Sequence, residues 1–166
     1  MQAADCHALP AIEIDAAAAF ADLPDYAHIA SADVPDAEER EYMLQKGPAW
    51  LALDSTGEAP IGFLQTDSRS SDIYIQELSV SSQWQGKGVG RTLLDTAQQF
   101  ARDHGFGAIT LTTFRAVPWN APFYARYGFA MLEEDMPGYL EQHLQNEADN
   151  GLARETRCAM RLAIDP

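Results

Sequence analysis

Basic residues are scarce in this chain. There are 11 Lys and Arg against 25 Asp and Glu among 166 residues, and the formal net charge is -14. Partners rich in phosphate, such as nucleic acids and anionic membranes, require basic patches, so this balance argues against both. An acidic surface would attract a cationic ligand, but it can also serve solubility alone. Both interpretations stay open from composition.

Cysteine is nearly absent, with only Cys6 and Cys158 near opposite ends of the chain. Neither these cysteines nor the histidines show a metal-ligand spacing, so no metal is expected. No apolar run approaches the ~20 residues of a membrane helix, and no basic segment followed by an apolar one opens the chain. These absences, with no linker in the sequence, predict a cytoplasmic protein with one domain over residues 1–166.

Apolar spacing and turn residues predict helices and strands in mixed order. A first helix is expected from Asp5, as its N-cap, to Pro24, and a second one within 33–47 that Gly47 ends. Strand, helix and strand over 73–114 make two strands parallel, so the fold class is α/β (α+β) with helices on the faces of a mixed sheet. The strands are expected at 48–54, 60–67, 71–80, 108–114 and 156–164, the first two as a hairpin, and the later helices at 89–105, 120–128 and 138–149.

Three glycines, at positions 86, 88 and 90, stand directly before the most amphipathic of these helices, in QWQGKGVGRTLL (83–94). Glycine before a helix lets an anion approach the free amides at the helix start, so phosphate is the expected guest. The dinucleotide pattern G-x-G-x-x-G fails because Arg91 holds its last position, and the P-loop pattern cannot be fitted.

The stretch from Gln85 to Gly90 spells Q-x-x-G-x-G after a strand that ends in ELSV, and it resembles the acyl-CoA site of the GCN5-related N-acetyltransferase (GNAT) family. NAPFYARYGF (120–129) resembles the family's Asn…Tyr-x-x-x-Gly-Phe segment. The resemblance covers roughly residues 48–135. It implies a mostly antiparallel sheet with a splayed parallel pair, acetyl-CoA as cosubstrate, and direct transfer to a primary amine of a small cationic or peptide substrate. A homodimer is compatible with the family and is left open.

Two features depart from the family pattern. Only MQAA precedes Asp5, where the family has its first strand, so one sheet edge is expected to lack that strand. Asn120 and Tyr124 lie four positions apart, whereas the family commonly places seven residues between this pair. Asn120 is therefore either a cofactor ligand or the N-cap of a short helix with Pro122 in its first turn.

In the strand DIYIQELSV the apolar positions change phase near Glu77. This pattern indicates a β-bulge or, alternatively, a strand buried on both faces. A bulge would leave backbone groups for the pantetheine arm of the cofactor. Together with the glycine stretch, the resemblance implies these cofactor-binding residues: Leu78, Ser79, Val80, Gln85, Gly86, Lys87, Gly88, Val89, Gly90 and Asn120. Lys87 would add a point charge, or else be a solvated lysine.

Acyl transfer to an amine requires a base and an acid. Glu77 is the expected base, with a cross-strand salt bridge as the alternative role. Tyr124 matches the family position for the acid that protonates the departing CoA thiolate. Tyr127 lies one turn away as its rival, and either ring could instead fill the core.

The resemblance places substrate specificity in the first two helices and in the late loop, which here are acidic. Acidic surface alone does not rank a polyamine, an amino sugar or a basic peptide terminus as the acceptor. Two alternatives remain: a non-catalytic acyl-CoA sensor, and an acyltransferase with another donor or acceptor. The acidic residues of these segments are Asp22, Asp25, Asp33, Asp36, Glu38, Glu39, Glu133, Glu134 and Asp135.

Overall fold

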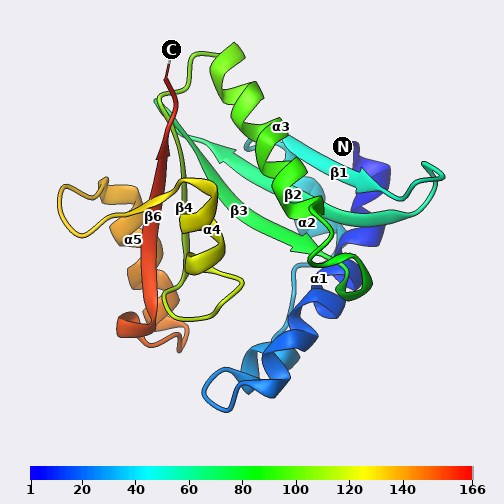
Figure 1. Ribbon diagram of the computed structural model, residues 1–166, viewed down its shortest axis with the longest axis horizontal. Coiled ribbons are helices and arrows are strands. Elements are labelled where there is room, and N and C mark those ends of the chain that lie inside the picture. Colours follow the sequence, from blue (N-terminus) through cyan, green and yellow to red (C-terminus); the bar gives the residue numbers. More distant parts are fainter. Residues whose placement is uncertain (166) are drawn as a thin grey trace. The chain divides into compact units, whose positions relative to one another are not determined.

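The computed structural model describes residues 1–165. Its contacts form two compact units: a first unit of Met1–Ser68 and Gln76–Ala97, and a second unit of Arg69–Ile75 and Gln98–Pro166. Strand β3 (Asp72–Val80) begins in the second unit and ends in the first. Helix α3 (Val89–Asp103) begins in the first unit and ends in the second; both elements are labelled in Figure 1.

The first unit opens with the predicted helix, but Asp5 is not its cap. Gln2 holds the N-cap position, and the Asp5 carboxylate lies three residues later and accepts the Gln2 amide at 2.7 Å. The sequence prediction took the acidic residue itself for the cap, whereas its side chain reaches back as the partner in a capping box. The helical elements here are η1 (Ala3–Ala8), α1 (Leu9–Ala17), η2 (Ala18–Asp22) and η3 (Ala27–Ser31).

Helix α2 (Ala37–Leu44) also begins with a capping box. The Asp36 carboxylate accepts the Glu39 amide, and the Glu39 carboxylate accepts the Asp36 amide, both at 2.9 Å. Gly47 does not end this helix, because Gln45 is its C-cap. A Cβ at Gly47 would lie 2.7 Å from the Thr66 carbonyl oxygen, so close backbone approach is what requires glycine there.

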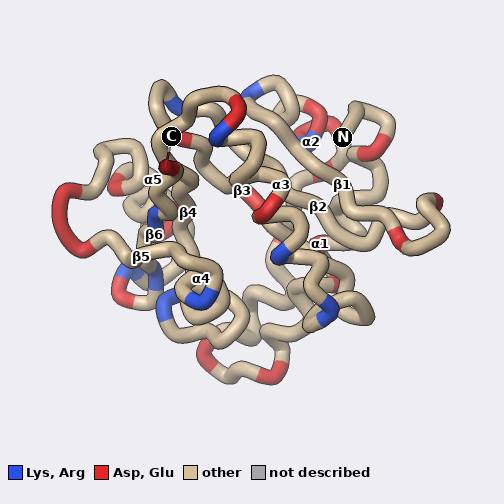
Figure 2. Tube along the Cα trace, turned by 45° about the horizontal axis from the view of Figure 1, so that its top comes forward, with Lys and Arg blue, Asp and Glu red and all other residues tan. Residues whose placement is uncertain are grey.

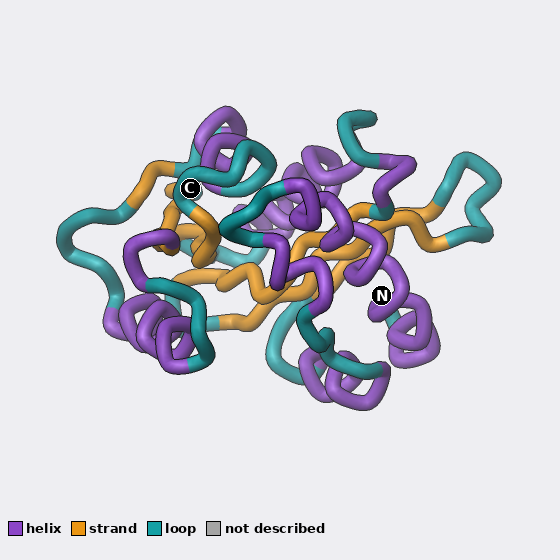
Figure 3. Tube along the Cα trace, turned by 90° about the horizontal axis from the view of Figure 1, so that it is seen from below, coloured by secondary structure: helices purple, strands orange, loops and turns teal. Residues whose placement is uncertain are grey.

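The predicted hairpin is confirmed. Strands β1 (Ala49–Leu53) and β2 (Pro60–Ser68) pair antiparallel from Ala49↔Gln65 to Leu53↔Pro60 (Figure 3). The apolar residues of η1, α1 and β2 form one core cluster: Cys6, Leu9, Ile12 and Phe63. Burying these side chains stabilises the unit, at about 25 cal/mol per Å² of apolar surface.

The six strands follow the order β1-β2-β3-β4-β6-β5, with no strand before β1 in residues 1–165. The first residues of β3 pair in parallel with β4 (Ala108–Phe114), from Asp72↔Ala108 to Tyr74↔Thr110. β6 (Arg157–Ala163) is antiparallel to both β4 and β5 (Ala130–Met131). The predicted mixed sheet is confirmed, and the two-residue β5 was missed because it is too short to show a period.

Helix α5 (Gly138–Asp149) covers β4 and β6 in the second unit (Figure 1). Its apolar positions pack on the sheet in a second core cluster of Tyr74, Leu140, Leu144 and Ala159.

The amphipathic helix predicted after the glycines is also confirmed. Leu93, Leu94, Ala97 and Ala101 are buried, and Arg91 and Asp95 are exposed. The spacing of apolar residues at every third or fourth position predicted this face correctly. Within residues 1–165, no helix combines the length and the apolar character that crossing a membrane requires.

Candidate active site

The glycine stretch lies in the first unit as an exposed loop between η4 (Ser82–Trp84) and α3. Gly86 has φ of 70° and Gly88 has φ of 89°, a region that L side chains rarely adopt. An added Cβ at either position would meet no atom within 4 Å, so the space beside both residues is open. Gly90 differs, because it lies inside the first turn of α3 without a positive φ.

The start of α3 supplies hydrogen-bond donors next to this open space. The first residue after the loop to bond along the helix is Thr92, whose amide donates to the Gly88 carbonyl at 3.0 Å. The amides of Val89 and Gly90 precede it and, like the first amides of any helix, have no intrahelical acceptor. Together with the positive end of the helix dipole, they form a place where an anion is stabilised.

Two side chains of the loop have partners within it. Gln85 donates from Nε2 to the Val80 carbonyl at 3.0 Å, and the Lys87 ammonium lies 5.0 Å from the centre of the Trp84 ring. The Val80 carbonyl, expected to be open for the pantetheine arm, therefore already accepts one hydrogen bond. Its second lone pair is the one that a ligand would use.

A carboxylate of α1 binds the start of η4, the element that precedes the loop; we call this contact between Asp15 and Ser82 the clasp. Asp15 accepts the Ser82 amide at Oδ2, at 2.6 Å, and the Ser82 hydroxyl at Oδ1, at 2.9 Å. Sequence reasoning missed this pair because its members are 67 positions apart.

Glu77 is half-buried on β3, and its Oε1 accepts the hydroxyl of the buried Ser79 at 2.7 Å. Two positions along a strand share a face, which accounts for this contact. β3 is buried on both faces from Asp72 to Ile75 and half-buried from Gln76 to Leu78. The two-sided burial that was one interpretation of the pattern thus holds for the first half of β3, and the bulge at Glu77 stays a prediction.

A buried arginine lies in the neighbourhood of Glu77. Burial lowers the pKa of the Arg40 guanidinium, and the negative charge of Glu77 opposes that shift. Arg40 is 1% exposed, forms an ion pair with Glu13, donates to Gln65 Oε1 at 2.8 Å and lies over the Phe63 ring.

Sequence reasoning missed this buried arginine, although a signal was present. Arg40 falls three residues after Ala37 and four before Leu44, on the face that packs inward. A charged residue on the inward face of a helix is expected to have a buried partner.

Asn120 lies in the second unit at the start of α4 (Ala121–Tyr127). Its backbone carbonyl accepts the amides of Phe123 and Tyr124, but its side chain makes no capping bond. Within residues 1–165, the side-chain oxygen Oδ1 is buried and has no hydrogen-bond partner. Asn120 is the N-cap residue of α4 with a proline in the first turn, so the alternative is confirmed for its position, although the side chain does not cap. A buried acceptor without a donor is costly, and the role of this oxygen as a cofactor ligand stays a prediction.

Tyr124 and Tyr127 differ in their surroundings on α4. Tyr124 is 8% exposed and packs edge-on against Phe123 and Phe129. Tyr127 is half-buried, and its hydroxyl donates to Gln98 Oε1 at 3.4 Å. The Tyr124 ring does fill the core, which leaves open what its hydroxyl does.

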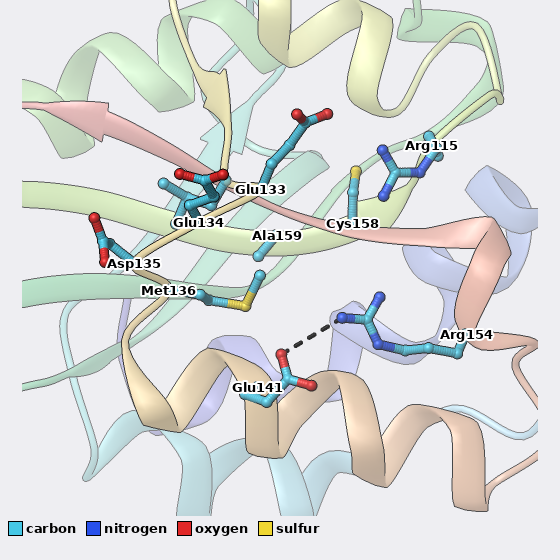
Figure 4. Close-up of a pocket in the computed structure, with 10 residues that line it drawn as sticks. Arg115, Glu133, Glu134, Asp135, Met136, Glu141, Arg154, Cys158 and Ala159 are labelled. Carbon is cyan, nitrogen blue, oxygen red and sulfur yellow. Dashed lines mark hydrogen bonds and ion pairs between the residues drawn. The ribbon is translucent and has the colours of Figure 1, made fainter.

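The acidic late loop lines a pocket of about 290 Å³ in the second unit (Figure 4). Glu133, Glu134 and Asp135 follow β5 after one intervening residue, Leu132, and form a run of acidic residues along the chain (Figure 2). Arg115 and Arg154 also line this pocket, and Arg154 forms an ion pair with Glu141 at 3.5 Å. The loop is thus less one-sided in charge than the sequence suggested.

The described residues contain no group of three or more His, Cys, Asp or Glu that could hold a metal ion. Glu77 and the nine expected cofactor residues from Leu78 to Gly90 lie in the first unit. Asn120 and Tyr124 lie in the second.

A profile of the Acetyltransferase (GNAT) family matches residues 16–129 of the chain. Among curated proteins, N-acetyltransferase 8 of Rattus norvegicus is 30% identical over 95 residues, 54% of this chain and 43% of that protein. The probable N-acetyltransferase camello of Xenopus tropicalis is 26% identical over 113 residues, 67% of this chain and 52% of that protein. The chain therefore spans about half the length of the curated relatives it matches.

Solved structures show the same fold at low identity. A GNAT-family acetyltransferase from Staphylococcus aureus Mu50 superposes with a TM-score of 0.71 at 15% identity, over 98% of this chain and 94% of that one. The ribosomal-protein-S18-alanine N-acetyltransferase of Escherichia coli gives 0.68 at 15% identity, over 100% and 92%. The PaiA N-acetyltransferase of Thermoplasma acidophilum, solved with coenzyme A, gives 0.66 at 16% identity, over 98% and 95%.

Proposed function

We propose that the chain, which belongs to the Acetyltransferase (GNAT) family, is an acetyl-CoA-dependent N-acetyltransferase of the EC 2.3.1 class, acting on a primary amine. One observation carries the proposal: two glycines with positive φ leave open space directly before the amides that open α3. That arrangement suits the pyrophosphate of coenzyme A. All of residues 1–166 are taken as one acetyltransferase domain.

The residues present fit this cofactor. The amides of Val89 and Gly90, with the loop of Gln85 to Gly88, would hold the pyrophosphate, and Lys87 would add a positive charge. The backbone of Leu78, Ser79 and Val80 would bond the pantetheine arm in the manner of an added strand. Asn120 would be a further ligand of the cofactor, through an Oδ1 that is buried and has no hydrogen-bond partner among the described residues.

Bound acetyl-CoA supplies an activated thioester, and the chain supplies the proton transfers. An alkylamine with a pKa near 10.4 is neutral in roughly one molecule in 2,500 at pH 7, a handicap of about 4.6 kcal/mol. Glu77 removes the proton from the substrate ammonium, directly or through a water. The Ser79 hydroxyl bonded to its Oε1 orients this carboxylate.

Tyr124 would supply the phenolic proton that the departing CoA thiolate needs. Tyr127 is the rival acid on the same helix, and its hydroxyl donates to Gln98 Oε1. The aromatic contacts of Tyr124 with Phe123 and Phe129 fix its ring. A fixed ring holds the proton donor in one position, which favours transfer.

A cationic acceptor is the substrate class we propose, because the chain has a formal net charge of -14. Asp22, Asp25, Glu133 and Glu134 belong to the segments that would meet it. A small polyamine, an amino sugar and a basic peptide terminus share the ammonium group that these carboxylates attract.

Thermal unfolding with acyl-CoAs tests the cofactor, and a thiol-release assay tests the reaction. Acetyl-CoA at 100 times its dissociation constant should stabilise the fold by about 2.7 kcal/mol. Thiol release in the presence of diamines, amino sugars and basic peptides should then exceed the rate without an amine.

Each negative result would overturn a different part of the proposal. No stabilisation by any acyl-CoA would overturn the cofactor assignment. Binding without thiol release from any amine would favour the non-catalytic sensor, and a stronger response to another acyl-CoA would replace the acetyl donor.

A further inference from the structure

We propose that Asp15 is a positioning residue for the cofactor: by clasping Ser82 it fixes the loop that leads into α3. The inference rests on the proposed function, because it concerns how this loop holds coenzyme A. Asp15 would not touch the cofactor itself and would act only through Ser82.

The clasp has the geometry of a helix cap supplied from another element. Ser82 is the first residue of η4, whose preceding residue, Ser81, makes no side-chain capping bond. The amide of Ser82 is therefore a donor that η4 itself leaves without an acceptor. Asp15 accepts that amide at 2.6 Å and the Ser82 hydroxyl at 2.9 Å, so one carboxylate satisfies both donors.

The carboxylate itself is held in a fixed place. Asp15 lies on α1, half-buried, and α1 packs into the first core cluster through Leu9 and Ile12. Glu13, two residues before it, forms the ion pair with the buried Arg40. A rigid helix thus supports the clasp, and the clasp transmits that rigidity to η4.

The loop has two further ties, and both lead to strands. The Ser81 amide donates to the Ile61 carbonyl at 2.9 Å, and Gln85 donates to the Val80 carbonyl at 3.0 Å. Asp15 adds a third tie, from Ser82 to α1. When η4 is held in this way, the chain enters the loop of Gly86 and Gly88 in one fixed direction. The loop then has fewer conformations before coenzyme A binds, so binding loses less conformational entropy.

The sign of the effect separates positioning from charge. A carboxylate near an anion site weakens anion binding by repulsion, so removing the charge alone would tighten coenzyme A. If Asp15 acts through Ser82, removing it must weaken coenzyme A instead. Glu58, an exposed acid of the first unit that has no role in the proposed site, gives the charge control as Glu58→Gln.

The experiment compares Asp15→Ala, Asp15→Asn, Ser82→Pro, the double variant of Asp15→Ala with Ser82→Pro, and Glu58→Gln in the full chain. Proline is tolerated as the first residue of a helix, and Ser81, with φ of -50° and ψ of 140°, has the extended backbone that a following proline requires. Ser82→Pro therefore removes both donors while keeping the turn. Calorimetry gives the dissociation constant of coenzyme A, and steady-state kinetics give KM for acetyl-CoA and kcat.

Asp15→Ala should raise the dissociation constant and KM about tenfold, the loss expected for roughly one hydrogen bond to a charged group, with kcat changed less than about twofold. Asp15→Asn, which keeps one acceptor oxygen, should recover part of the affinity. Asp15→Ala should have no further effect in the Ser82→Pro background, since the clasp is already lost there.

Three results would overturn the inference: unchanged or tighter coenzyme A binding in Asp15→Ala, the same weakening in Glu58→Gln, or additive effects of Asp15→Ala and Ser82→Pro. If Asp15→Ala does not fold, the dissociation constants of coenzyme A in Asp15→Asn and Ser82→Pro decide instead. Both should be raised, and unchanged or tighter binding in both variants would overturn the inference. Failure of the unaltered protein to bind coenzyme A would sink the proposed function instead, so the two failures are distinct.

Discussion

Ser79 donates a hydrogen bond from its buried hydroxyl to Oε1 of Glu77, two residues earlier on the same strand, at 2.7 Å. The bond occupies one carboxylate oxygen and limits rotation of the group. We therefore expect Oε2 to be the oxygen that accepts the substrate proton. A base held in this way can act without first paying to order its side chain.

Glu77→Gln should lower kcat for a cationic amine by roughly 10²- to 10⁴-fold at pH 7, the usual contribution of a general base. The deficit should shrink as the pH approaches 10, because solvent then deprotonates more of the amine. Initial rates between pH 7 and 10 measure this. Glu58→Gln, at an exposed position of the hairpin turn, is the control. A deficit that stays constant with pH would remove Glu77 from proton transfer.

Tyr124→Phe should lower turnover by roughly 10²-fold and leave the dissociation constant of coenzyme A unchanged, because it removes a proton donor and keeps the ring. Tyr127→Phe loses only the bond to Gln98 and should keep its turnover. Single-turnover rates and calorimetry on the two variants separate these effects. The reverse pattern would make Tyr127 the acid.

Gly88→Ala should weaken coenzyme A, because the loop would have to leave its φ of 89° to accommodate a side chain. Gly57, in the hairpin turn, has φ of 78°, and an added Cβ meets no atom within 4 Å at either position. Gly57→Ala should therefore cost a similar amount of stability, about 1–2 kcal/mol, with no effect on the cofactor. Equal coenzyme A binding in the two variants would contradict the assignment of the loop.

Stability should fall as the pH rises from about 10 to 12. Burial raises the pKa of Tyr74 to about 12, and the pKa of Tyr139 is raised in the same direction. The stabilisation that each of these neutral tyrosines contributes is fully present below the pKa of tyrosine in the unfolded chain, near 10. It is lost as the pH rises through the raised pKa of that tyrosine in the folded protein. For Tyr74, which is 6% exposed, the steepest slope is about 1.4 kcal/mol per pH unit.

Tyr74→Phe should lower stability at pH 8 by about 1 kcal/mol, because it loses the bond to Thr112, and it should flatten the alkaline slope. Urea unfolding at several pH values measures both quantities. Tyr42→Phe, on a ring that is 60% exposed, should leave the slope as it is. An unchanged slope in Tyr74→Phe would show that another group causes the alkaline loss.

Local pattern predicted the elements of this fold well. The helix after the glycines followed from apolar residues every third or fourth position, and the hairpin from two short apolar runs around a turn that contains glycine. The cap at Asp5 and the helix end at Gly47 were wrong. In both cases the residue type was typical of the assigned role, while the observed role depends on a partner: the Gln2 amide for Asp5 and the Thr66 carbonyl for Gly47.

The candidate site was predicted less completely for a related reason. The motif predicted the glycine loop before α3, whereas the positive φ of Gly86 and Gly88 was known only from the structure. Contacts between distant positions leave no local period, so the clasp of Asp15 on Ser82 and the pair of Arg40 with Gln65 were not foreseen. The bulge at Glu77 and the roles of Glu77 and Tyr124 stay predictions.

The position of β6 bears on how the chain acquires its structure during synthesis. β6 lies between β4 and β5 in the sheet, yet its residues, Arg157–Ala163, follow both strands along the chain and are synthesised after them. Neither neighbour can complete its ladder until then, and contacts this far apart in sequence form slowly. A nascent chain halted before Arg157 would expose two strands awaiting their middle partner, which makes it a substrate for chaperones.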